Sequence, residues 1–101
     1  MTHRVLCGDF AHYQDPEEEW EVAGFATAEA AQEYARRFIR AQIEDLRREM
    51  PDAEALRRAY LAWGEYAAAE GFDSAAWVQH CIETPATRRA ETDYAALDPG
   101  R

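Results

Sequence analysis

The fold is decided by residues 27–52, which read TAEAAQEYARRFIRAQIEDLRREMPD. Apolar side chains recur in this stretch at the three- and four-residue spacing that places them on one face of a helix. They are Ala31, Ala35, Phe38, Ile39, Ile43, Leu46 and Met50. Thr27 can cap the amino end, and Pro51 disfavours helical geometry in the residue before it. The pattern therefore predicts one long amphipathic helix over residues 28–50.

Charged side chains occupy the rest of this helix, with arginines and acids interleaved along it. The arginines are Arg36, Arg37, Arg40, Arg47 and Arg48. Because acidic residues are spaced to pair with them along the helix, we expect a solvated, self-paired face.

A second helix is predicted directly after the first, because Asp52 can cap a new amino end and Gly64 suits a helix end. Its inward side chains are expected to be Ala55, Leu56, Ala59, Tyr60 and Trp63. Two helices joined by so short a link form an antiparallel hairpin.

Two stretches before the long helix, residues 4–10 and 20–25, alternate as β-strands do. The alternation sets Val5 and Cys7 opposite Leu6 in the first, and Trp20 and Val22 opposite Ala23 and Phe25 in the second. We expect these strands to pair antiparallel. The isolated glycines, Gly8 and Gly24, indicate places where a strand bends or another element packs closely.

The sequence predicts the secondary structure of residues 65–101 less clearly. Residues 65–71 fit either an irregular helical extension or a short third strand. Asp73 or Ser74 can cap a third helix, whose inward side chains would be Trp77, Val78, Cys81 and Ile82. Pro85 suits the first turn of a last helix, with Ala86, Ala90, Tyr94 and Leu97 on one face. Residues 98–101 are expected to form a frayed tail.

The sequence thus predicts a single α+β domain over residues 1–97. Its parts are an antiparallel β-hairpin, with or without a third short strand, packed against a helical hairpin and one or two further helices.

Composition excludes several classes of partner. The formal charge is −9, from 20 acidic residues and 11 basic ones, so phosphate backbones and anionic lipid surfaces should repel the chain. The two cysteines are too few for a disulfide scaffold. No signal-peptide pattern opens the chain, and no apolar run approaches the roughly 20 residues that span a bilayer. We therefore expect a cytoplasmic protein that binds neither nucleic acid nor membrane and needs no cofactor.

The densest chemistry lies in residues 9–19, DFAHYQDPEEE, between the two predicted strands. The candidate binding residues are Asp9, His12, Tyr13, Asp15 and Glu18. Imidazole and carboxylates together suit a hard or borderline divalent ion, and His12 could serve as a general base oriented by Asp9 or Asp15. A second histidine and an obvious nucleophile are missing, so a structural loop is the favoured interpretation and metal binding stays open.

Several short motifs carry a resemblance. They are Asp9, Phe10, His12, Tyr13, Asp15 and Glu18; Ala23-Gly24-Phe25; Tyr60-Leu61-Ala62-Trp63-Gly64-Glu65; and Phe72, Ser74, Ala75 and Cys81. With them, residues 4–83 resemble a family of small bacterial proteins that have an N-terminal Asn/Asp-Phe-x-His-Tyr-x-Asp-x-x-Glu segment. This chain departs from the family after Glu65, where Tyr66-Ala67-Ala68 replaces Asp-Pro and apolar residues. The resemblance implies a fold and a candidate site at the His12 segment, but no particular reaction.

The aromatic side chains lead to the functional expectation. Three tryptophans and four phenylalanines are more than a small sheet and a few helices need for a core. The second face of the sheet, with Leu6 and Phe25, would also lie open, and such faces are often covered by another subunit. We expect a non-enzymatic domain acting through protein–protein or self-association, as a homodimer formed through the sheet or an aromatic helix face. The alternative is a small-ligand or divalent-metal-binding protein, a hydrolase included, centred on His12.

Overall fold

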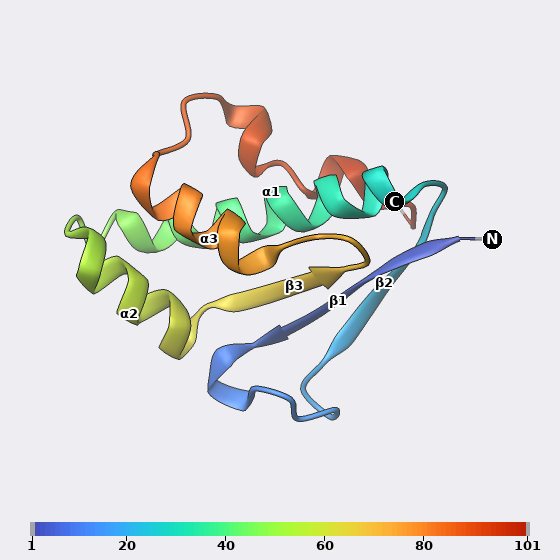
Figure 1. Ribbon diagram of the computed structural model, residues 1–101, viewed down its shortest axis with the longest axis horizontal. Helices are drawn as coiled ribbons and strands as arrows, with labels where there is room; N and C mark the ends of the chain where they lie inside the picture. The colour runs from blue at the N-terminus through green and yellow to red at the C-terminus, as the bar shows by residue number, and fades with distance from the viewer. Residues whose placement is uncertain (1, 101) are drawn as a thin grey trace.

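Three antiparallel strands form the sheet of this protein, in the order β2-β1-β3. They are β1 (His3–Asp9), β2 (Trp20–Phe25) and β3 (Glu65–Ala69). The computed structural model describes residues 2–100 and is drawn in Figure 1. The hairpin predicted from the alternation is confirmed, and the ambiguous segment after Gly64 is a third strand, paired with β1.

Three α-helices complete the predicted α+β fold: α1 (Ala28–Arg47), α2 (Ala53–Trp63) and α3 (Ser74–Glu83). All three lie on one side of the sheet, with α1 running over β1 and β3 (Figure 1). Each helix begins where a side chain accepts from a free backbone N–H. Thr27 accepts from Ala30 at 3.1 Å, Asp52 from Ala55 at 3.0 Å and Asp73 from Ala76 at 3.1 Å. The predicted caps are thus confirmed, and Asp73 rather than Ser74 caps α3.

The end of α1 lies three residues before its predicted position. The N–H groups of Glu49 and Met50 both donate to the carbonyl of Leu46, which closes a turn at the end of the helix. Pro51 keeps the helix from resuming after this turn, because the residue before a proline avoids helical geometry.

The last predicted helix, over residues 85–97, is wrong. That segment forms two short 3₁₀ turns, Arg89–Thr92 and Ala95–Leu97. It is held to α1 from the side: the N–H of Ala86 donates to Glu44 and the ring of Tyr94 packs edge-on against Phe38 at 5.1 Å. These tertiary contacts replace the local hydrogen bonds that a helix would have made.

A β-bulge at Gly24 changes the face on which Phe25 lies. Arg4 pairs with Ala23 and His3 with Phe25, so Gly24 is an extra residue, and its φ of 97° suits glycine. The extra residue turns the Phe25 side chain from the outer face to the core, where it is 2 % exposed. The sequence placed Phe25 beside Ala23 on the other face, and that prediction is wrong.

The core lies between the sheet and the helices. Its fully buried members include Val5 and Cys7 from β1, Ile39 and Ile43 from α1, Leu56 and Tyr60 from α2, and Cys81 from α3. Cys7 and Cys81 are both buried, free thiols. Trp63 was also expected to face inward, but it is 75 % exposed. It is the last residue of α2, beyond the elements that cover Leu56 and Tyr60.

Candidate functional site

The segment around His12 is a self-bonded loop between β1 and β2. A carboxylate oxygen of Asp9 accepts from the backbone N–H of His12 at 2.8 Å and caps the 3₁₀ turn Phe10–His12. Asp15 accepts from the backbone N–H of Glu17 at 3.0 Å, and Gln14 adopts a left-handed conformation with φ of 63°. Two of the five candidate residues, Asp9 and Asp15, therefore hold the loop's own backbone.

The His12 ring lies against Asp9. Its Nδ1 is 3.0 Å from Oδ1 of Asp9, while the imidazole side chain is 54 % exposed. The hydrogen bond and charge of Asp9 raise the pKa of His12 above its usual 6.5, and the charges of Glu18 and Asp15 add to the rise. A histidine held in this way carries a proton over more of the neutral range than a free one.

Replacing Asp9 by asparagine is expected to lower the pKa of His12, as read from an NMR pH titration of its ring protons. Asparagine keeps a side-chain oxygen that can accept from the backbone N–H of His12, but it removes the charge that favours the imidazolium. Since folding raises this pKa, the pair stabilises the protein fully below pH 6.5 and loses that effect as pH rises through the folded-state pKa. The matched variant Asp15→Asn should lower the His12 pKa less. Equal titration curves for wild type and Asp9→Asn would contradict this account.

Three of the candidate residues converge as a metal site would require. A donor atom from each of Asp9, His12 and Glu18 lies within 4.8 Å of the others. Carboxylate oxygens and one imidazole nitrogen can hold a divalent cation, provided that the imidazole is deprotonated. Tyr13 and Asp15 do not belong to this convergence.

Tyr13 belongs to an aromatic corner that the sequence did not predict. Its ring stands edge-on to Tyr66 of β3, with centroids 5.6 Å apart and planes at 75°, and stacks on Phe10 at 5.8 Å. The Tyr66 hydroxyl reaches across β1 and donates to Glu19 at 2.6 Å. Burial, followed by the effect of Glu19, raises the pKa of Tyr66 to about 12.

Gly8 makes this corner possible. The Tyr66 ring lies directly over it, so that a β-carbon at Gly8 would stand 2.4 Å from the Tyr66 hydroxyl. In the sequence, the isolated glycine within a predicted strand was the one signal that another part of the chain packs closely against it. It could not reveal which side chain approaches.

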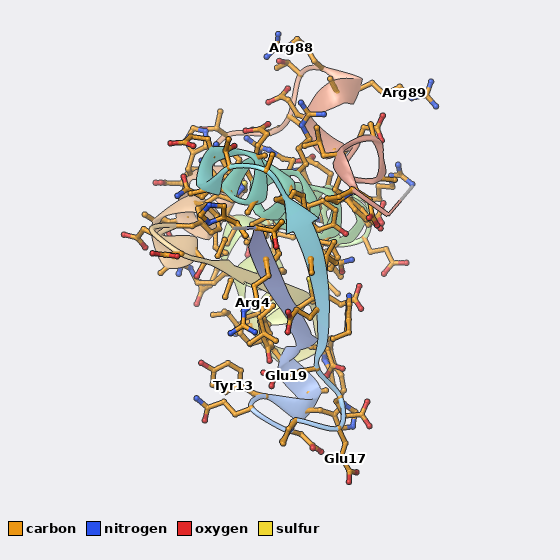
Figure 2. All side chains as sticks on the ribbon, turned by 90° about the vertical axis from the view of Figure 1, so that its right-hand side faces the viewer. Arg4, Tyr13, Glu17, Glu19, Arg88 and Arg89 are labelled. Atoms are coloured by element: carbon orange, nitrogen blue, oxygen red, sulfur yellow. The ribbon has the colours of Figure 1, made fainter. Side chains whose placement is uncertain are left out.

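The outer face of the sheet continues from this corner. One hollow of about 450 Å³ is lined by outer-face residues that include Arg4, Leu6, Glu21, Ala23 and Ala68, and also by Ala28 and Ala31 at the start of α1. A second, of about 270 Å³, is lined by Leu6 and Ala68 again and by the corner residues Phe10, Tyr13, Glu19 and Tyr66. Arg4 and Tyr13 project from the same side of the β1–β2 hairpin, whereas Glu17 points away at its tip (Figure 2). The two hollows thus form one outer face with Leu6 at its centre.

Neither cysteine supplies a reactive thiolate. Burial raises the pKa of Cys7 to about 12 and that of Cys81 to about 11. Both thiols are therefore protonated at neutral pH and behave as small apolar groups in the core.

Among residues 2–100, none of the helices combines the length and apolar character needed to cross a membrane. Comparison with protein-family models, with curated proteins and with solved structures found no match for this chain.

Proposed function

We propose that this chain is a non-enzymatic domain that acts by self-association, through the face of its sheet that the helices leave uncovered. The single observation that carries the proposal is the contrast between the two faces. On β1, Val5 and Cys7 are fully buried beneath the helices, while Leu6 between them is 38 % exposed.

The composition of the outer face supports this proposal. Across the sheet, Leu6 pairs with the small side chain of Ala68 on one side and with Glu21 on the other, while Ala23 pairs with Arg4. Tyr13, which is 60 % exposed, stands at one end. A protruding leucine beside the small side chain of Ala68 suits the surface of a second sheet, and apolar surface left open in this way commonly marks an interaction site. The buried position of Phe25 shifts the expected contact away from that residue and onto Leu6.

Sedimentation velocity over a range of concentrations tests the proposal. Wild type is expected to shift with concentration from the monomer of 11.5 kDa to a dimer. Leu6→Lys should remain monomeric, because a charge at the centre of the interface opposes burial. The matched control is Leu61→Lys on α2, where the leucine is 47 % exposed; it should dimerise like wild type. A wild-type monomer at the highest concentration would refute self-association. Loss of the dimer only in Leu61→Lys would indicate that the dimer contact lies on the helices and not on the sheet.

A second candidate function, divalent-cation binding, is favoured by the convergence of Asp9, His12 and Glu18 within 4.8 Å. Elemental analysis of protein purified without chelators tests it. Stoichiometric metal that is lost in His12→Ala would establish this function. Metal-free protein whose His12 resonances do not respond to added Zn²⁺ or Mn²⁺ would refute it.

A further inference from the structure

The outer face carries opposite chemistry at its two ends. At one end, the Arg4 guanidinium is 71 % exposed and lies 3.2 Å from the carboxylate of Glu21, which is 44 % exposed. At the other end are the Tyr13 and Tyr66 rings and the carboxylate of Glu19, which among residues 2–100 makes no ion pair. A carboxylate beside an aromatic face is a binding site for a guanidinium group.

The spacing along β1 relates these ends by symmetry. Arg4 lies two residues before Leu6 and Gly8 two residues after it, all three on the outer side of the strand. Consider a twofold axis between two facing sheets, perpendicular to the strands and passing over Leu6. This axis reverses the strand direction, so Arg4 of one copy lies opposite Gly8 of the other, and Tyr66 and Glu19 cover Gly8. The contact of Arg4 is then made twice, as are all contacts away from the axis of an isologous dimer.

We propose that, in the self-associated state, Arg4 of each copy occupies the corner formed by Tyr13, Tyr66 and Glu19 of the other copy. This inference rests on the proposed self-association and adds its geometry and its binding site. Leaving Glu21 costs Arg4 little, because an ion pair between exposed groups contributes little to stability. Between the sheets, the guanidinium instead meets a carboxylate and an aromatic face that are partly removed from water.

The net charge of −9 on each copy opposes any association at long range. Salt at about 0.15 M reduces the range of this repulsion to about 8 Å, which leaves contacts inside an interface largely intact. The experiment is therefore run at that ionic strength.

Two charge reversals and their mixture test the pairing. Arg4→Glu places glutamate against Glu19, and Glu19→Arg places arginine against Arg4, so each variant alone should dimerise roughly tenfold or more weakly than wild type. In an equimolar mixture, both contacts of the mixed dimer join opposite charges, and sedimentation velocity should show the dimer restored. Circular dichroism of each variant checks that the fold is intact.

The control is Glu21→Gln, which removes the partner of Arg4 within the same chain. It should leave dimerisation unchanged or tighter, whereas weakening as large as that of Arg4→Glu would overturn the inference. A wild-type dimer whose mixed variants stay monomeric would also overturn it, while leaving self-association intact. A wild type that never dimerises would remove both proposals together.

Discussion

Replacing Phe25 by alanine is expected to lower the free energy of unfolding by about 3–5 kcal/mol, the usual cost of removing a buried phenylalanine ring. Phe25 is 2 % exposed and its ring packs at 5.3 Å on Tyr34. Removing the ring leaves a cavity between β2 and α1 that the surrounding side chains fill only in part. Urea denaturation followed by circular dichroism measures the loss.

The control for this prediction is Leu6→Ala, on the opposite face of the sheet. Leu6 is 38 % exposed, so in the monomer its truncation should cost less than about 1 kcal/mol. The comparison must be made at a concentration where no dimer forms. If the two variants lose equal stability, the bulge at Gly24 does not turn Phe25 into the core.

Replacing Arg40 by alanine is expected to lower the free energy of unfolding by about 3 kcal/mol. Arg40 is the one charged residue of the described chain that is buried, at 2 % exposure. Its Nη1 donates to the backbone carbonyls of Thr84 and Cys81, and its guanidinium lies near Glu44 and Glu91. Because those carboxylates are partly exposed and can regain water, the loss should lie at the low end of the range for broken buried pairs.

Arg36→Ala is the matched control, on the same helix. Arg36 pairs with Glu33 at 2.9 Å, but its side chain is 33 % exposed, so the loss should stay within about 1 kcal/mol. Hydrogen exchange adds a second measurement: in Arg40→Ala, the amide of Ala86, which donates to Glu44, should exchange faster. An Arg40→Ala variant no less stable than Arg36→Ala would show that Arg40 does not hold residues 84–91 onto α1.

Local rules account for the parts of the fold that were predicted. The caps at Thr27, Asp52 and Asp73 act within three residues, and the alternation of Val5, Leu6 and Cys7 expresses a two-residue period. Such signals are complete within a short stretch of chain. They place the three α-helices, the first hairpin and the buried face of β1.

The third strand shows where local rules stop. Residues 65–69 read EYAAA, and alanine favours a helix when nothing else decides. The segment is a strand because β1 supplies its hydrogen-bond partners. For the same reason, the 3₁₀ turns after Thr84 depend on contacts with α1 that no local pattern reveals.

The candidate site also contains contacts that the sequence predicted and contacts that it did not. The sequence placed Asp9, His12 and Glu18 in one loop, and the structure brings their donor atoms together. The contact between Tyr13 and Tyr66 could not be predicted from the sequence, because Tyr66 comes from a strand more than 50 residues later. Arg40 was expected in the solvated arginine face of α1, and only the docking of α3 and residues 84–91 buries it.

By itself, the sequence determined the three α-helices, the β1–β2 hairpin and the crowding of imidazole and carboxylates around His12. Capping, side-chain periodicity and loop chemistry act over a few residues and can therefore be predicted from the sequence. Only the tertiary structure decided that Phe25 turns inward, that Arg40 is buried, and that Tyr66 crosses Gly8 to meet Glu19. Each of these depends on which distant segment packs against it, and that is set by the energy of the whole core.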